Sequence, residues 1–574
     1  MKKELFLGNE AVARGFWEAG CRFVSSYPGT PSTEITEYAA EYAEMDCEWA
    51  PNEKVALEAA YGAAVAGARS FCGMKHVGLN VAADPLFTAS YTGINAGLVV
   101  AVADDPGMHS SQNEQDSRHY ARASKTLMLE PADSAECRDF AAAAFALSEA
   151  FDTPVLLRMS TRVSHSRSLT ETGSRAEIPL RPYEKNPGKY VMMPAMAQKR
   201  HVLVEERILR QRAWAETCAF NRAEYHDKSI GVICAGINYQ YAREALGERA
   251  SYLKLGCVYP LPERLIRDFC AACGAVYVAE DLDDCIEQHC KSLGLEVHGK
   301  DVFPRVGEFS QSILRRAILG EELPAGALDL AVPARPPVLC PGCPHRGLFY
   351  VLKKRKIFVS GDIGCYTLGA LAPLESMDTC VCMGASISGL HGHNKADPEN
   401  AARSVAVIGD STFMHSGVTG LINIAYNRSN SVVIILDNSI TGMTGHQQNP
   451  TTGITLKGDP TAAVSLEKVC EAVGIRRVFV VDPYDLSATE EALTQALAAA
   501  EPAVIISRRP CALLKYVKPK PSLRVDPEKC TGCRACMRIG CPAISMKNKY
   551  AAVDPTQCVG CGVCVQLCRF GAVT

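Results

Sequence analysis

A chain of 574 residues has room for three or four domains, each with its own hydrophobic core. Its formal net charge is only −3, which argues against a nucleic-acid partner and favours small substrates and protein partners. The first residues lack the apolar stretch of a signal peptide, and no apolar run is long enough to span a bilayer. We therefore expect a cytoplasmic protein without membrane contact.

Residues 1–170 are expected to form the first domain. Alanine-rich segments at 50–70 and 137–149 have helical character and alternate with apolar runs at 97–103 and 154–158. This alternation is typical of a doubly wound parallel sheet with helices on both faces.

The middle of the chain indicates a linker and a smaller domain. Residues 171–200 are polar and contain several prolines, which predicts a linker. Three apolar runs then predict a smaller α/β domain over 201–332, and the proline-rich segment 333–337 marks its boundary.

A second doubly wound parallel sheet is expected over 333–517, with its clearest strands at 404–408, 431–436 and 503–507. A short Lys/Pro-rich link leads from it to a last small domain, 522–574. The predicted fold class is thus α/β, with two large parallel-sheet domains, a smaller α/β domain between them and a ferredoxin-like α+β tail.

Polar motifs follow two strands of the second sheet. Gly409-Asp410-Ser411 comes directly after the first strand, and Asp437-Asn438 follows the next. Carboxyl ends of parallel strands meet at one edge, where open α/β sheets bind ligands. A carboxylate, an amide and a nearby backbone carbonyl can hold Mg²⁺, and a helix N-terminus there adds N–H donors for a diphosphate. We expect Asp410, Asn438 and the carbonyl of Ile440 to be the metal ligands.

The tail carries two Cys-x2-Cys-x2-Cys runs, each followed by a fourth cysteine. Such runs wrap three corners of one [4Fe-4S] cube, and the fourth cysteine of each run ligates the other cluster. The expected ligands are Cys530, Cys533, Cys536 and Cys568 for one cluster and Cys541, Cys558, Cys561 and Cys564 for the other. Zinc also binds Cys-x2-Cys pairs, but triplets followed by Cys-Pro favour clusters. Cluster thiolates require a reducing compartment.

The two strand-end motifs together resemble the Gly-Asp-Gly…Asn-Asn signature of thiamine-diphosphate enzymes, with Ser411 and Asp437 as departures. The resemblance implies that Gly409, Asp410, Ser411 and Asn438 bind this cofactor. These enzymes protonate the cofactor's aminopyrimidine with a glutamate that begins a helix and is followed nine residues later by Gly. Glu53 and Gly62 have this spacing, and Glu58 is the alternative. Glu53 could also be an ordinary helix-start carboxylate favoured by the dipole.

Three further segments resemble the 2-oxoacid:ferredoxin oxidoreductase family: Tyr27-Pro-Gly-Thr30-Pro, Cys340-Pro-Gly-Cys343-Pro-His345 and Asp362-Ile-Gly-Cys365. The resemblance extends over nearly the whole chain and is strongest to the large subunits of the family's indolepyruvate-specific members, including Met74-Lys-His-Val-Gly-Leu-Asn80. It implies that Thr30 and Arg118 bind the substrate carboxylate and that His345 and Asp362 contact the thiamine diphosphate. Arg118 could instead form a surface ion pair.

The implied reaction is oxidative decarboxylation of an arylpyruvate, chiefly indole-3-pyruvate, with coenzyme A as acyl acceptor and ferredoxin as electron acceptor. Glu53 would be the catalytic residue that activates thiamine diphosphate, and a smaller β subunit would complete an α2β2 assembly. Another 2-oxoacid, such as phenylglyoxylate or a branched-chain oxoacid, is an alternative substrate. An alternative function of a different class is that of an electron-transfer subunit in a larger redox complex.

A third cluster is a further expectation that the resemblance raises. Relatives hold a cluster near the thiamine with four cysteines, and the matching positions are Cys340, Cys343, Cys365 and Cys511. Buried free cysteines also simply fill core space. Both interpretations remain open at this point.

Overall fold

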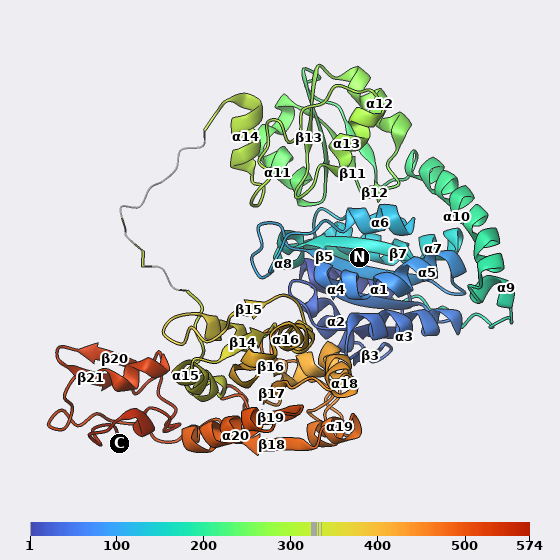
Figure 1. The fold of residues 1–574 in the computed structure, drawn as a ribbon. Helices are drawn as coiled ribbons and strands as arrows, with labels where there is room; N and C mark the ends of the chain where they lie inside the picture. Colours follow the sequence, from blue (N-terminus) through green and yellow to red (C-terminus); the bar gives the residue numbers. More distant parts are fainter. Residues whose placement is uncertain (1, 323–329, 331, 334–335) are drawn as a thin grey trace. The chain divides into compact units, whose positions relative to one another are not determined.

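The computed structural model describes residues 2–322, 330, 332–333 and 336–574. The chain divides into two compact units, residues 1–329 and 330–574 (Figure 1), and each is described by itself. Residues 323–329 and 331 of the predicted small domain, and 334–335 of the expected boundary segment, lie outside the described residues.

The first unit is built on a seven-stranded sheet with the strand order β12-β6-β7-β5-β4-β2-β3. Its strands are β2 (Phe23–Ser26), β3 (Asp46–Trp49), β4 (Ser70–Lys75), β5 (Leu98–Asp104), β6 (Met128–Leu129), β7 (Val155–Ser160) and β12 (Cys257–Tyr259). All neighbouring strands pair in parallel except β12, which is antiparallel to β6. The predicted doubly wound sheet is confirmed.

Helices cover this sheet on both faces because successive strand residues point to opposite sides. The covering helices are α1 (Gly8–Glu18), α3 (Glu53–Val65), α5 (Ala83–Thr92) and α7 (Ser134–Phe151). On one face Phe16 of α1 stacks on Phe71 of β4, with ring centroids 4.3 Å apart, and also packs against Phe145 of α7. On the other, Leu57 of α3 shares a core with Cys72, the next residue of β4.

The segment predicted as a linker is partly helical. Strand β8 (Arg167–Thr172), which pairs with β1 (Lys2–Leu7), ends at the start of the predicted linker. Helices α9 (Pro187–Tyr190) and α10 (Pro194–Ala215) follow. Both helices carry proline in their first turn, where its missing N–H costs nothing. Proline therefore starts helices in this segment.

The smaller domain has a four-stranded sheet in the order β13-β10-β11-β9, made of β9 (Arg222–Glu224), β10 (Ile230–Ala235), β11 (Ser251–Leu255) and β13 (Ala275–Ala279). Its helices are α11 (Ile237–Leu246), α12 (Glu263–Ala272), α13 (Cys285–Ser292) and α14 (Gln311–Leu319). Strand β12 leaves this domain to join the first sheet, and one hydrophobic core includes residues of both sheets. The two domains therefore form one unit.

The second unit contains a six-stranded, wholly parallel sheet in the order β15-β14-β16-β17-β19-β18. Its strands are β14 (Phe358–Gly361), β15 (Thr379–Cys380), β16 (Ser404–Gly409), β17 (Val432–Asp437), β18 (Arg477–Val481) and β19 (Ala503–Arg508). The main helices are α15 (His345–Arg355), α16 (Ala385–Ala396), α18 (Val418–Tyr426), α19 (Leu466–Ala472) and α20 (Leu486–Ala498). The second predicted parallel sheet is thus confirmed.

The cysteine-rich tail packs on this sheet domain. It consists of a hairpin, β20 (Ile544–Lys547) and β21 (Tyr550–Val553), and two short 3₁₀ turns, η5 (Ala535–Ile539) and η6 (Val565–Leu567). Ile539 and Val563 of the tail belong to the same buried core as Leu348 of α15 and Leu493 of α20. The tail and the sheet domain are therefore one folded unit. No helix among the described residues is long and apolar enough to cross a bilayer.

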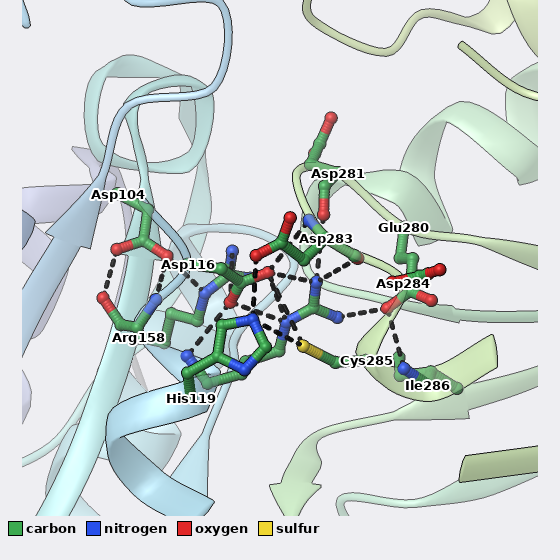
Figure 2. Close-up of polar contacts among 12 residues, drawn as sticks. Asp104, Asp116, His119, Arg158, Glu280, Asp281, Asp283, Asp284, Cys285 and Ile286 are labelled. Carbon is green, nitrogen blue, oxygen red and sulfur yellow. Dashed lines mark hydrogen bonds and ion pairs between the residues drawn. The ribbon is translucent and has the colours of Figure 1, made fainter. Parts of the chain in front are cut away.

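A buried network of charges ties the smaller domain to the first sheet (Figure 2). Arg118, at the start of α6 (Arg118–Ser124), forms ion pairs of 2.5 Å with Asp116 and with Glu280, which follows β13. Arg158 of β7 pairs with Asp104 at the end of β5, at 2.7 Å. All these side chains are almost inaccessible to solvent. The attraction of Arg118 and Arg158 holds the pKa of Asp116 well below its usual range, although burial opposes this shift.

We predict that Arg118→Met lowers the stability of the protein by about 3–5 kcal/mol, because it leaves the buried Glu280 without its cation and Asp116 with only the more distant Arg158, at 3.8 Å. The measurement is the melting temperature of the purified protein. Arg305→Met is the matched control, since Arg305 is exposed and pairs with Asp284 at the surface. Equal melting temperatures for the two variants would contradict the structural role of Arg118.

Candidate active site and cluster domain

Three oxygen atoms converge where β16 and β17 end. The side-chain oxygen of Asn438 faces Oδ1 of Asp410 and the carbonyl oxygen of Ile440. If the amide were turned over, its nitrogen would donate to these atoms at 3.3 and 2.7 Å. Either way the amide end of Asn438 meets these two atoms, and with its oxygen turned toward them the three groups offer the oxygen ligands that a hard cation such as Mg²⁺ requires. The structure thus brings together the three predicted metal ligands.

The chemistry of this set fits a cation. Burial and the neighbouring charge of Asp437 raise the pKa of Asp410 to about 7. A divalent ion would favour the ionised form of this carboxylate. Among the described residues, no three His, Cys, Asp or Glu side chains are placed to hold a single metal ion. That absence is compatible with this set, because two of its three ligands are an amide and a backbone carbonyl.

Asp437 has a different role. Its Oδ2 accepts a hydrogen bond of 2.6 Å from Nε of Arg508, at the end of β19. Arg508 also pairs with Glu467 of α19 at 2.6 Å. Asp437, which stands where the family signature has Asn, is thus neutralised by Arg508 on the adjacent strand.

The other predicted cofactor residues lie at the same edge of the sheet. Ser411 accepts a hydrogen bond from Thr441 at 2.9 Å. Gly409 lies against the ring of Tyr366, which a Cβ at position 409 would approach to 2.8 Å, so a larger residue would collide. His345, at the start of α15, packs edge-on against the same ring, and burial lowers the pKa of His345 to about 4. His345 is therefore neutral at physiological pH.

Asp362, predicted to contact the cofactor, is bound by backbone groups. It follows β14 and is fully buried. Its oxygens accept from the N–H groups of Ile363 and Gly384 at 2.9 Å and of Ser386 at 3.0 Å. Ser386 lies in the first turn of α16, so the carboxylate stabilises the positive end of this helix. Asp362 thereby fixes the loop at the sheet edge.

The four cysteines proposed for a third cluster lie close together in the second unit. A charge on Cys340 or Cys511 would raise the pKa of Cys365, and a charge on Cys340 would do the same at Cys343 and Cys511. Burial is the larger cause of the raised pKa at each of these three thiols. The quartet also adjoins the three oxygens: the backbone N–H of Cys511 donates to the carbonyl of Asn438 at 2.9 Å.

The eight tail cysteines fall into two groups. Besides burial, the pKa of Cys536 is raised by Cys530, Cys568 and Cys533, whereas that of Cys564 is raised most by Cys561, Cys541 and Cys558. Cys568 thus joins the first run and Cys541 the second, as the crossed pattern requires. Each iron of a cube takes its own thiolate, so these groups need not converge on a single ion. Backbone N–H groups point at the sulfurs, with Ala572 donating to Cys568 at 3.2 Å.

The second group of tail cysteines lies against the Cys-Pro-Gly-Cys segment. Gly342, between Cys340 and Cys343, is so close to the side chain of Val559 that a Cβ would approach it to 2.2 Å. Its φ of +67° also favours glycine. Val559 is flanked by Cys558 and precedes Cys561 by two residues. The proposed third cluster and the second tail cluster would therefore be neighbours.

Arg346 fixes this contact. This buried side chain donates to the carbonyls of Ile539 and Gly540 in the tail, at 3.1 Å for Ile539, and to those of Leu339 and Cys340 in the sheet domain, at 2.9 Å for Cys340. Tyr484 adds a hydrogen bond to the carbonyl of Gly342. Sequence reasoning missed Arg346, although its position directly after His345 was the available signal.

The first unit holds the predicted catalytic Glu53. It is the first residue of α3, is 5% exposed, and follows Asn52, whose side chain caps the helix by accepting from the N–H of Val55 at 2.9 Å. The start of α4 (His76–Val81) closes over it: a Cβ at Gly78 would lie 2.6 Å from Oε1 of Glu53. Glu53 is thus poorly solvated, as a carboxylate that protonates a cofactor ring must be. Glu58, the alternative, is exposed and pairs with Lys54.

The two predicted substrate residues differ in their surroundings. Thr30 lies in the loop between β2 and α2 (Thr33–Ala40), partly accessible, with a cis bond to Pro31. Arg118 has its donors directed at Asp116, Glu280 and the carbonyls of Asp281 and Asp283. The structure therefore directs Arg118 to ion pairs rather than leaving it free to bind a substrate carboxylate. The pairs are buried, whereas the alternative stated from the sequence was a surface ion pair. Nothing local in the sequence signalled Glu280, which is 162 residues away.

Comparison with known proteins gives matches over the whole chain. Residues 14–230 match the family "Pyruvate flavodoxin/ferredoxin oxidoreductase, thiamine diP-bdg", residues 362–507 the C-terminal thiamine pyrophosphate-binding domain of thiamine pyrophosphate enzymes, and residues 522–569 the 4Fe-4S dicluster domain. Indolepyruvate oxidoreductase subunit IorA of Pyrococcus horikoshii is 41% identical over 100% of this chain and 96% of its own length. IorA of Thermococcus kodakarensis is 41% identical over 100% and 97%.

Among solved structures, a 2-oxoglutarate:ferredoxin oxidoreductase from Magnetococcus marinus with 2-oxoglutarate, coenzyme A and succinyl-CoA bound is similar at 17% identity and a TM-score of 0.47. The match covers 55% of this chain and 65% of that one.

We predict that Asp410→Ala prevents retention of thiamine diphosphate, because it removes the only charged member of the converging oxygens. Cofactor content of the desalted protein, measured by its conversion to fluorescent thiochrome, tests this. Asp437→Asn is the matched control and should retain the cofactor, since Asp437 pairs with Arg508 instead. Loss of cofactor in both variants, or in neither, would contradict this assignment.

Proposed function

Because the chain belongs to the family of IorA subunits of indolepyruvate oxidoreductase, we propose that it decarboxylates indole-3-pyruvate oxidatively and passes the electrons to ferredoxin. It is an oxidoreductase that acts on a 2-oxoacid, with thiamine diphosphate and iron–sulfur clusters as cofactors. The observation that carries the proposal is the convergence of Asp410, Asn438 and Ile440 in the unit that also holds the two groups of cluster cysteines.

The complete reaction includes coenzyme A. The bond between the carboxylate and the 2-oxo carbon breaks and releases carbon dioxide. A thioester forms to the coenzyme sulfur, whose S–H bond breaks and releases a proton, and two electrons leave singly through the clusters to ferredoxin. Thiamine diphosphate supplies the electron sink for the decarboxylation when it is bound. Arylacetyl-CoA is the organic product.

The chain's own residues divide this work. Asp410, Asn438 and the Ile440 carbonyl would hold Mg²⁺ and, through it, the diphosphate, with N–H donors from the helical turns that begin at Asp410. Glu53, buried under the start of α4, would exchange a proton with the aminopyrimidine. Neutral His345 lines the same sheet edge as Gly409 and can donate or accept one hydrogen bond there.

A smaller β subunit is proposed as the partner, in an α2β2 assembly. The relatives' names describe IorA as one subunit of an oxidoreductase, which supports a second chain. Cluster thiolates persist in a reducing compartment, which favours the cytoplasm.

The first experiment is anaerobic reduction of ferredoxin by this chain co-expressed with its partner subunit. We expect reduction that depends on coenzyme A and is fastest with indolepyruvate, compared with pyruvate and 2-oxoglutarate. Glu53→Gln should bind clusters normally and be slower by about 10²–10⁴-fold, the usual contribution of a positioned acid. If pyruvate or 2-oxoglutarate is the best substrate, the arylpyruvate assignment is wrong, and if no 2-oxoacid reduces ferredoxin, so is the reaction.

A third cluster held by Cys340, Cys343, Cys365 and Cys511 is also proposed, since these residues lie together between the three oxygens and the tail. Cys511→Ser should then lower iron and sulfide content by one cluster per chain and remove one signal from the electron paramagnetic resonance spectrum of the reduced protein. Cys470→Ser is the matched control, because Cys470 is a free cysteine in a different hydrophobic core. Unchanged iron content in Cys511→Ser would show that the quartet only fills space.

A further inference from the structure

Lys75, the last residue of β4, is a buried cation that has no ion-pair partner in the part of the chain that the structure describes. It is 7% exposed, and its Nζ donates to the backbone carbonyl of Ser110 at 2.5 Å. Among the described residues, no carboxylate forms an ion pair with it. A buried ammonium group that lacks an anionic partner is costly, so a fold that retains one has a use for it.

Asp105, whose charge acts on Lys75, already accepts hydrogen bonds from other residues. The negative charge of Asp105 acts on Lys75, but its Oδ2 accepts from Ser110 and Ser111 at 2.8 and 2.6 Å. Its Oδ1 accepts from Thr161 at 2.7 Å. Asp105 therefore shapes the loop that follows β5, and the hydrogen bond that Lys75 makes to this loop is to a neutral carbonyl. Burial lowers the pKa of Lys75 to about 8, against the effect of Asp105.

Lys75 also lies beside the loop that carries Thr30. A Cβ on Gly29 would be 3.0 Å from Cβ and 3.9 Å from Cδ of Lys75, so the lysine stem runs along this glycine. Strands β2, β4 and β5 are consecutive neighbours in the sheet and parallel, and their carboxyl ends carry Thr30, Lys75 and Ser110 respectively. The lysine is thus at the centre of the ligand-binding edge of this sheet.

The next residue, His76, has the same shortage of partners. It is 1% exposed, and among the described residues neither ring nitrogen makes a well-formed hydrogen bond, although a backbone group of Asn113 lies close enough to act on the ring. Burial lowers the pKa of His76, and the positive charge of Lys75 acts in the same direction. Two residues further on, Gly78 contacts the carboxylate of Glu53. A lysine without an ion pair, a buried histidine and the predicted catalytic glutamate therefore meet at the start of one short helix.

We propose that Lys75 binds the carboxylate of the 2-oxoacid substrate, between Thr30 on one side and His76 on the other. This inference rests on the proposed function and replaces Arg118 in the carboxylate-binding role. The bound substrate carboxylate would then be the counter-ion of Lys75. A lysine also suits a carboxylate that must leave as carbon dioxide, because a single ammonium group holds it less rigidly than the two-pronged grip of arginine.

The test is steady-state kinetics of Lys75→Met in the complex with the partner subunit, using whichever 2-oxoacid the wild type oxidises best. Methionine keeps the apolar stem and removes the charge. We expect KM to rise about 10- to 100-fold, the usual effect of losing a hydrogen bond to a charged group, with kcat changed by less than about 3-fold. Lys291→Met, which removes an exposed lysine paired with Glu287, is the matched control and should leave both constants unchanged.

A pair of unreactive inhibitors separates charge from shape. Indole-3-propionate carries the carboxylate, and indole-3-propionamide has the same shape without the charge. The wild type should bind the acid more tightly than the amide, and Lys75→Met should lose this preference while its affinity for the amide stays the same. An unchanged KM in Lys75→Met, or equal losses for acid and amide, would overturn the proposal.

The outcomes distinguish this proposal from the proposed function. A wild type that oxidises no 2-oxoacid would refute the function itself. A wild type that is active and a Lys75→Met variant that keeps its KM would refute only the role of Lys75. Cluster content of Lys75→Met should match the wild type, and its melting temperature should be no lower, because the substitution removes a buried charge that has no ion-pair partner. Both results together exclude a folding defect.

Discussion

The chemistry of this protein depends on one constraint, the direction of its parallel strands. In both large domains neighbouring strands end at the same edge, and the chain must turn there through loops and helix starts. Glycine at Gly409 and Gly78 allows those turns to approach other groups closely. Polar side chains that are distant in sequence therefore meet without any long-range motif that specifies the meeting.

The pairing of buried charges separates structural from functional groups. Asp437 with Arg508, and Arg118 with Asp116 and Glu280, are closed sets in which each charge has its partner. Asp410 and Lys75, by contrast, have no ion-pair partner among the described residues. The environment of each disfavours its charged form. Charges of this second kind have binding capacity left for a metal ion or a substrate.

Local patterns predicted much of this arrangement. The fold class followed from the alternation of apolar runs and alanine-rich helices, and the meeting of Asp410 with Asn438 followed from their positions after adjacent strands. The crossed grouping of Cys541 and Cys568 was expected from the two-cluster ferredoxin pattern, although four residues rather than the usual three separate Cys536 from Cys541. Each of these depends on short-range periodicity or on the geometry of one domain.

What the sequence did not predict depends on contacts between distant segments. The occupation of Arg118 required Glu280 from another domain, and the clamp made by Arg346 required the backbone of the tail. The helices in the supposed linker were missed because its prolines were interpreted as breakers, although proline in a first turn starts a helix. Lys75 belongs to the segment Met74–Asn80 that resembles the family. Only the three-dimensional structure, in which no described carboxylate forms an ion pair with it, distinguishes it from an ordinary lysine.

The clamp at Arg346 and the shared core have a consequence for how this protein fails. Cys536 and Cys564 are members of the same buried core as Leu348, which lies in the helix that begins at His345. An oxidant that destroys a tail cluster would therefore leave polar, oxidised sulfur inside a core that also stabilises the sheet domain 333–517. Oxidative damage to the tail clusters would therefore also disturb the packing of the sheet domain 333–517. Electron transfer and cofactor binding would be lost together.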